Sequence, residues 1–214
     1  MRHVGLASAA AAVGLSCAIA ACNASNAPVT PSHDHGSMGH AVSGAAVGGD
    51  PAVGPQLAEV RAATAIYHDV ANAHAAGYPT ANEPCVASPA GTMGIHAANQ
   101  ALIADPALDP LRPELLLYEP KNGDLKLVAV EYLKFVVLRN RTSGATRTWV
   151  SPTRWDPAVY EIAIPTPQLF GKTFDGPMAG HTPTMPWHWD LHVWIWAPNP
   201  NGMFTQFNPK VHCN

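Results

Sequence analysis

Apolar and polar positions alternate in a stretch near the C-terminal end of the chain, from about Trp187 to Trp196. Tryptophan, valine, isoleucine and leucine favour strands, and prolines flank the stretch, so the pattern predicts a β-strand. Because successive side chains of a strand point to opposite faces, one face is apolar throughout. The other face carries His188, Asp190, His192, Trp194 and Trp196.

Two Asn-Gly dipeptides predict β-hairpins, since this pair is preferred in two-residue type I′ turns. The first, Asn122-Gly123, separates a strand that begins at Leu115 from a long strand at 125–138. In this register Glu131 lies opposite Glu114, and two like charges are unfavourable there unless a cation bridges them.

The second dipeptide, Asn201-Gly202, predicts that 203–207 folds back on the tryptophan-rich strand. A two-residue turn would then place Cys213 opposite Asp190 and Val211 opposite His192. Further strands are expected at about 146–150 and 159–164, whereas 165–186 shows no pattern that predicts an element.

Helical spacing of apolar residues is found from Pro55 to Gly77, where the proline suits a first turn and the glycine supplies a stop. A shorter helix is expected at about 97–104, in an otherwise loop-rich region. These elements predict an α+β fold, with an N-terminal amphipathic helix packed on a curved antiparallel sheet or open barrel that contains the Asn-Gly hairpins.

The polar face of the tryptophan-rich strand offers metal ligands, because neutral imidazole and anionic carboxylate suit zinc, copper, iron and manganese. On a straight strand His188 and His192 lie roughly 13 Å apart, so each pairs more easily with Asp190 between them. A bulge or a helical turn would bring the two histidines together. The alternative is a set of hydrogen-bonded residues beside an aromatic cluster.

Three residues from other parts of the chain are candidates for the same site. His181 lies just before the strand, and His96 follows two glycines that allow close backbone approach, although a capping role would also explain it. Glu131 is a carboxylate on an apolar face and needs a metal, a proton or an arginine as its partner. The candidate arginines are Arg139, Arg141, Arg147 and Arg154. The expected metal site thus draws on His188, Asp190, His192, His181, His96 and Glu131.

The first 21 residues combine an early positive charge, an apolar run and small residues, which is typical of an export signal. The end of this segment, Ile19-Ala20-Ala21-Cys22, resembles the lipobox of bacterial lipoproteins. The resemblance implies cleavage before Cys22, lipidation of its thiol and anchoring to a membrane of the cell envelope. Asn23 then favours the outer membrane in a two-membrane cell. A plain secretory signal, the alternative, would also export the chain.

Two cysteines, Cys85 and Cys213, remain after these steps. In an oxidising compartment the pair predicts a disulfide that links an early loop to the C-terminal end. The alternative is that Cys213 is a metal ligand beside the tryptophan-rich strand.

Residues 22–54 are rich in alanine, glycine, serine, proline and valine, and we interpret them as a flexible tether before a single globular domain at 55–214. Imidazole and thioether groups are ligands for copper, so the tether could capture a metal ion, or its histidines could be plain solvated linker. The candidate tether ligands are His33, His35, Met38 and His40.

The net charge of −3 and the lack of a basic patch argue against a nucleic-acid partner. The sequence also contains no glycine-rich phosphate loop and no nucleophile elbow. The expected function is an exported, lipid-anchored protein that binds a divalent transition metal of the copper or zinc class. One alternative is a metal-dependent enzyme that uses the same site. Another is a binding module in which Trp194 and Trp196 stack on a carbohydrate or another small ligand.

Overall fold

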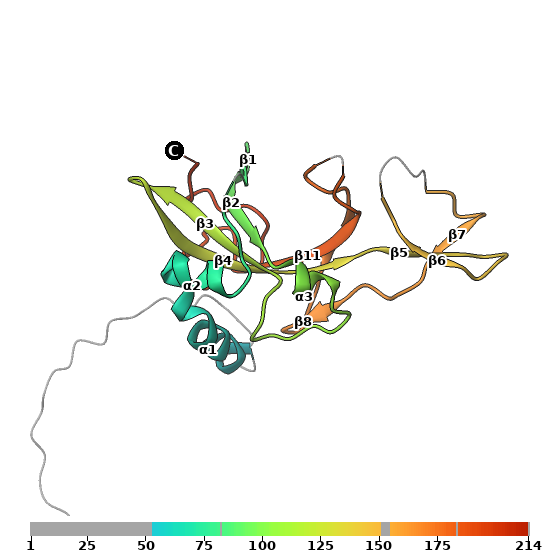
Figure 1. Ribbon diagram of the computed structural model, residues 1–214, viewed down its shortest axis with the longest axis horizontal. Helices are drawn as coiled ribbons and strands as arrows, with labels where there is room; N and C mark the ends of the chain where they lie inside the picture. The colour runs from blue at the N-terminus through green and yellow to red at the C-terminus, as the bar shows by residue number, and fades with distance from the viewer. Residues whose placement is uncertain (1–52, 82, 151–154, 183, 214) are drawn as a thin grey trace, which may run out of the picture. The chain divides into compact units, whose positions relative to one another are not determined.

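The computed structural model describes residues 53–81, 83–150, 155–182 and 184–213 (Figure 1). The predicted signal peptide, Cys22 and the tether ligands lie outside these ranges. Among the described residues, no helix is both long enough and apolar enough to cross a membrane.

A curled antiparallel sheet forms the main layer of the fold, so that the described chain is mostly β with few, short helices (Figure 1). Its six strands follow the order β1-β2-β3-β4-β11-β10. They are β1 (Cys85–Ser88), β2 (Gly91–Ala98), β3 (Leu115–Lys121), β4 (Asp124–Phe135), β10 (Asp175–Met178) and β11 (His188–Val193). The predicted curved antiparallel sheet is confirmed, but strands β1, β2 and β10 were not expected.

The first predicted hairpin is confirmed in β3 and β4. Asn122 and Gly123 have φ values of 55° and 86°, and a type I′ turn requires positive φ at both positions. The two strands continue away from this turn as a long antiparallel ladder.

A bulge in β4 makes the predicted register wrong at its far end. Val128 of β4 has no partner in β3, because the β4 residues on either side of it pair with two consecutive β3 residues. Beyond Val128 the pairing is therefore shifted by one residue. Glu131 consequently pairs with Leu115 and not with Glu114. Glu114 instead forms a buried ion pair of 2.9 Å with Lys134.

The second predicted hairpin, at Asn201-Gly202, is not formed. The strand β11 ends at Val193, and 194–213 runs in turns and loops. Prolines recur in this segment, and a proline cannot donate a hydrogen bond to a sheet ladder.

Strand β11 has different neighbours from those predicted. It pairs with β4 on one side, where His192 lies opposite Glu131 and not Val211. On the other side it pairs with β10, where Asp190 lies opposite Asp175 and not Cys213. The alternation of side chains along β11 agrees with the prediction, because its apolar face is buried in the main core.

The predicted helix at 55–77 is interrupted. The structure has α1 (Val53–Thr64), a 3₁₀ turn η1 (Ala65–His68) and α2 (Val70–Ala75). Asp69 causes the break, because its extended backbone ends the turn and its side chain accepts the backbone N–H of Ala71 to cap a new helix.

The second predicted helix begins later than expected, as α3 (Gln100–Ala104), because Asn99 caps it by accepting the backbone N–H groups of Ala101 and Leu102. As a result His96 stays within strand β2.

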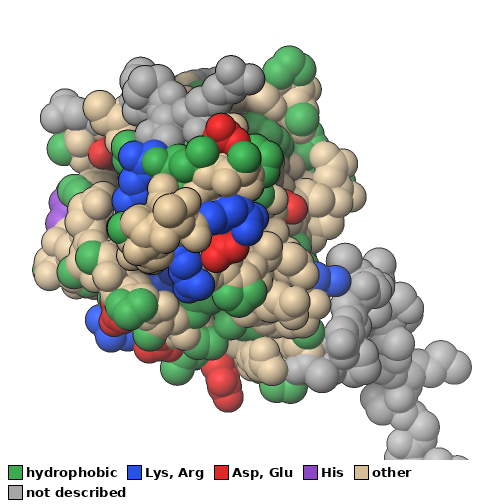
Figure 2. All heavy atoms as spheres, turned by 90° about the vertical axis from the view of Figure 1, so that its right-hand side faces the viewer, with side chains coloured by type: hydrophobic (Ala, Val, Ile, Leu, Met, Phe, Trp, Pro, Cys, Tyr) green, Lys and Arg blue, Asp and Glu red, His purple; other side chains and the backbone are tan. Residues whose placement is uncertain are grey.

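A small second sheet lies beyond the end of β4, in the order β6-β5-β7. Its strands are β5 (Val137–Asn140), β6 (Thr146–Thr148) and β7 (Tyr160–Ile162). The pair β8 (Gln168–Leu169) and β9 (Lys172–Thr173) follows. Figure 2 views the β5–β7 end of the molecule, where basic and acidic side chains lie side by side. Arg139 and Arg141 of this region both pair with Glu161.

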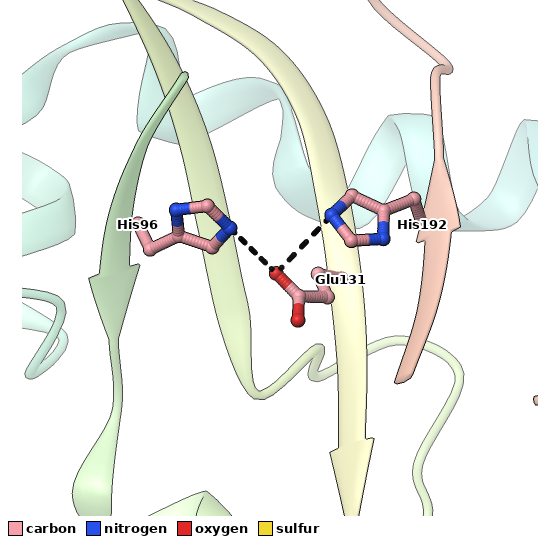
Figure 3. Close-up of side chains that lie close together, drawn as sticks. All are labelled: His96, Glu131 and His192. Atoms are coloured by element: carbon pink, nitrogen blue, oxygen red, sulfur yellow. Dashed lines mark ion pairs between the residues drawn. The ribbon is translucent and has the colours of Figure 1, made fainter. Parts of the chain in front are cut away.

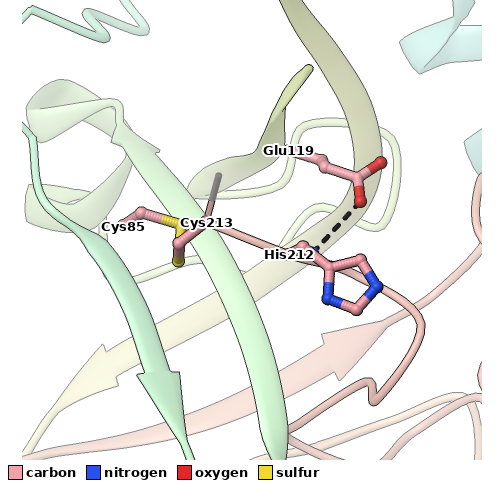
Figure 4. Close-up of a disulfide and its surroundings, with 4 residues drawn as sticks. All are labelled: Cys85, Glu119, His212 and Cys213. Atoms are coloured by element: carbon pink, nitrogen blue, oxygen red, sulfur yellow. Dashed lines mark hydrogen bonds between the residues drawn. A yellow bond between two sulfur atoms is a disulfide. The ribbon is translucent and has the colours of Figure 1, made fainter. Parts of the chain in front are cut away.

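The disulfide between Cys85 and Cys213 is confirmed, so Cys213 is not a free thiolate ligand (Figure 4). Beside it the carboxylate of Glu119 accepts the backbone N–H of His212 at 3.1 Å. These two contacts hold the C-terminal segment against β1 and β3.

Replacing both Cys85 and Cys213 with serine is expected to destabilise the fold, because the bond closes a loop with a sequence separation of 128 residues. The free energy of unfolding should fall by about 2 to 5 kcal/mol. Urea denaturation of the oxidised protein and of the double variant measures the difference. If the double variant has the same free energy of unfolding as the unmodified protein, the disulfide contributes little to stability.

Candidate metal centre

Three strands of the main sheet bring His96, Glu131 and His192 together (Figure 3). His96 comes from β2, Glu131 from β4 and His192 from β11. The Oε2 atom of Glu131 lies 3.3 Å from Nε2 of His96 and 3.7 Å from Nε2 of His192. The ligand atoms of the three side chains all lie within 4.8 Å of one another, so the group could hold a metal ion.

Sheet geometry explains this meeting. Glu131 and His192 are direct cross-strand partners of β4 and β11, so their side chains leave the sheet on the same face. His96 lies two strands away, and the curl of the sheet turns β2 toward the same point. In the described part of the chain, this is the one group of three or more histidine, cysteine or acidic side chains with such spacing.

The facing atoms of the group lack hydrogen-bond partners. Both ring nitrogens of His96, both ring nitrogens of His192 and Oε2 of Glu131 are buried without a hydrogen bond from the described residues. The side chains of Glu131 and His192 are 1% and 0% exposed. A buried polar atom without a partner costs about 1–3 kcal/mol, and most buried polar groups are paired. A metal ion would satisfy these atoms, because it accepts lone pairs from several donor atoms at once.

Burial also sets the protonation of the three side chains. It lowers the pKa of His96 to about 3, an effect to which the neighbouring His181 adds, and it lowers the pKa of His192 well below the ordinary value. Both imidazoles are thus neutral near pH 7, the form that binds metals. Burial raises the pKa of Glu131 well above its ordinary value, and Asp190 raises it further. A bound cation would offset this cost of burying the carboxylate.

Asp190 lies beside the group, between two histidines of its own strand. Its Oδ2 atom is 3.9 Å from Nδ1 of His192 and 3.9 Å from Nε2 of His188. Its Oδ1 atom accepts a hydrogen bond from Gln206 at 3.4 Å. A carboxylate hydrogen-bonded to the second nitrogen of a metal-binding histidine commonly orients the ring. Asp190 lies on the corresponding side of His192, but at 3.9 Å the two groups are not hydrogen-bonded.

His188 and His181 complete the surroundings. Nδ1 of His188 lies 3.2 Å from the carbonyl oxygen of Pro186, and its buried Nε2 has no hydrogen-bond partner among the described residues. The ring of His181 lies 6.0 Å from that of His188 and 5.3 Å from that of His96. All six candidate ligands thus gather in one region, with three of them in a tight group.

An arginine partner for Glu131 is not found among the described residues. Arg139 and Arg141 pair with another glutamate, Arg147 lies over an aromatic ring, and Arg154 lies outside the described ranges. The contacts of Glu131 are instead the two histidines.

The two tryptophans proposed to stack on a ligand are engaged in packing. Trp194 is 2% exposed, and its indole N–H donates to the carbonyl oxygen of Thr205. Trp196 is half-buried against the ring of His68 and the guanidinium of Arg61. Trp194 therefore offers almost no exposed ring face, whereas Trp196 lines a pocket of about 390 Å³ near Arg61.

Two features of the site were missed from the sequence. Gln206, which binds Asp190, lies in a segment that was expected to form a strand. A pocket of about 390 Å³ beside the group is lined by His96, Glu131 and His181 together with apolar side chains. Its walls come from β1, β2, β3, β4, α3 and the loop before β11, so no local pattern indicated it.

Gly94 is the close backbone approach that the sequence suggested near His96. Its φ is +104°, and an added Cβ would lie 2.7 Å from the carbonyl oxygen of Tyr118 on β3. Gly94→Ala should therefore push β2 away from β3 and lower the free energy of unfolding by about 1–3 kcal/mol. Urea denaturation measures the change. Gly54→Ala is the matched control, because a Cβ there meets nothing within 4 Å. Equal effects of the two variants would contradict the prediction.

Comparison with protein-family models, with curated proteins and with solved structures found no match for this chain. The function therefore has to be inferred from the residues of the chain itself.

Proposed function

We propose that this chain is an exported, lipid-anchored metal-binding protein whose centre is formed by His96, Glu131 and His192. The observation that carries the proposal is a buried set of two neutral imidazoles and one carboxylate, whose facing atoms lack hydrogen-bond partners among the described residues. Two histidines and a carboxylate form a donor set that suits zinc and copper. The donor atoms therefore suit these metals in their chemical type as well as in their spacing.

The other candidate residues have supporting roles in this proposal. Asp190 lies 3.9 Å from the ring nitrogen of His192 that faces away from Glu131, which is beyond hydrogen-bond distance, and Gln206 donates a hydrogen bond to Asp190 in turn. His181 lies next to His96, in the loop before β11, and lines the pocket beside the centre. His188 is held at Pro186 with its free nitrogen toward Asp190.

The proposed location rests on the N-terminal sequence. The segment that ends at Cys22 supports export and lipid anchoring, and His33, His35, Met38 and His40 of the tether would act as an auxiliary capture arm for metal. The Cys85–Cys213 disulfide supports export, because such bonds persist mainly in oxidising compartments.

A metal-dependent enzyme is the second candidate, and one observation favours it. Catalytic zinc sites have three protein ligands and an open position, whereas structural sites are closed by four. The tight group here has three members, and two of them line a pocket.

Metal content provides the direct test. The chain with Cys22→Ser, and with alanine in place of His33, His35 and His40, should retain one transition-metal ion per molecule after dialysis against a mild chelator. The His192→Ala variant should lose most of this metal, because it lacks one of the three ligands. The control variant His74→Ala should keep the metal, because His74 is an exposed residue outside the centre. Elemental analysis measures the content. A folded parent protein without metal, or a His192→Ala variant that keeps its metal, would refute the proposed centre.

The variant Glu131→Gln tests whether the carboxylate of Glu131 binds metal or only stabilises the fold. The change keeps the shape of the side chain but removes a buried charge, so the variant should bind metal at least tenfold more weakly. In excess chelator it should unfold at a temperature equal to or above that of the unmodified protein, because the cost of burying the carboxylate is gone. Thermal unfolding with and without chelator measures both effects. A lower unfolding temperature in chelator would indicate that Glu131 is a structural ion-pair partner instead.

A further inference from the structure

The pocket beside the candidate metal centre reaches only one side of it. His96 and Glu131 line this pocket of about 390 Å³, whereas His192 is not among its described lining residues. His192 is fully buried on the far side, next to Asp190. The side of the centre between His96 and Glu131 is therefore the side that a small molecule can reach.

One wall of the pocket is a continuous apolar surface. It consists of a separate hydrophobic cluster formed by the sheet, α3 and the loop before β11, and all of its members line the pocket. These are Ala98, Ile103, Leu115, Leu133, Phe135 and Met185. An apolar pocket with a few convergent polar groups at one end is the usual form of a small-molecule site, and this volume lies at the lower end of the range for such sites.

The charges around the pocket restrict the ligand further. No lysine or arginine is among the described lining residues, and the acidic ones are Glu131 and Glu83. The nearby Lys134 is held by Glu114 and by backbone oxygens of the loop after α3. An anion in the pocket would thus find its positive partner only at the metal. A divalent ion held by one carboxylate and neutral histidines keeps one net positive charge. Because Glu83 is exposed and its charge is screened by solvent, the centre favours a ligand with one negative charge.

We infer that the pocket binds a small monocarboxylate with an apolar body. The carboxylate binds the metal centre from the side between His96 and Glu131, and the body packs against the apolar wall. This inference rests on the proposed metal centre. It names the class of ligand that the centre binds. The ligand class is the same whether the protein only binds the ligand or also converts it chemically.

Phenylacetate is a suitable probe, because it joins a single carboxylate to an apolar ring of a size that the pocket accepts. The chain with Cys22→Ser and with alanine in place of His33, His35 and His40 is used again, so that zinc is not held by the tether. Isothermal titration of this zinc-loaded chain should show one binding site for phenylacetate. Acetate, which lacks the ring, and phenylacetamide, which lacks the charge, should each bind at least tenfold more weakly. Treatment with chelator should abolish phenylacetate binding, and added zinc should restore it.

Two variants locate the site. Ala98→Leu extends a side chain from the wall into the pocket and should weaken phenylacetate binding at least tenfold with the metal content unchanged. Ala87→Leu is the matched control, because Ala87 is an exposed alanine on the neighbouring strand β1 and does not line the pocket. It should bind phenylacetate as the unmodified protein does.

The outcomes separate the two proposals. If the protein retains zinc but binds phenylacetate no better than acetate, or binds it equally well in chelator, the ligand inference is wrong and the metal centre stands. Equal loss of binding in the Ala98 and Ala87 variants would also overturn the ligand inference. If the folded protein retains neither zinc nor copper, the metal centre is wrong, and the ligand inference fails with it.

Discussion

The burial of one carboxylate is the constraint on which the rest of this structure depends. Glu131 lies in the middle of the longest strand, on a face that is otherwise apolar, and its side chain is 1% exposed. An unpaired carboxylate in such a position is strongly unfavourable, so the fold must supply polar partners from other strands. It does so with His96 from one side and His192 from the other. Since both imidazoles are themselves buried and neutral, they do not neutralise the charge, and the whole group is left suited to a cation.

The bulge at Val128 decides which residues meet across the sheet. Side chains along a strand alternate with a period of two, so one extra residue changes which of them share a face. Leu127, before the bulge, belongs to the main core, whereas Ala129, after it, belongs to the cluster on the opposite face. Glu131 follows Ala129 at the same parity, and thereby shares the face of Leu117 and of its β2 partner His96. A local irregularity of the backbone thus places the carboxylate within the candidate metal centre.

Local sequence patterns predicted the features that depend on neighbouring residues. The alternation along β11 placed His188, Asp190 and His192 on one face, and the Asn122-Gly123 dipeptide gave the correct turn. Residue chemistry selected all six side chains that gather around the candidate centre, and the count of remaining cysteines gave the disulfide. These inferences needed only periodicity, turn preferences and the chemistry of ligands.

Long-range pairing was beyond the reach of such patterns. The sequence favoured a second hairpin, but β10 occupies the edge of β11, and no feature of Asp175–Met178 indicates that partner. Strands β1 and β2 contain glycine and small residues that resemble a loop, although β2 carries His96. The bulge at Val128 has no signature in a run of apolar residues. The pocket combines elements that are distant in sequence, and only the folded sheet brings them together.

The Cys85–Cys213 bond has a consequence for the biosynthesis of the protein. Cys213 lies after all six strands of the main sheet, at a sequence separation of 128 residues from Cys85, so the bond can form only after these strands have been made. The strand that contains the other cysteine pairs with β2, the strand of His96. A chain that ends early would lack this link beside β2, and one that ends before β11 would also lack His192. Covalent closure and an intact set of ligands therefore both require that the chain has been made beyond β11.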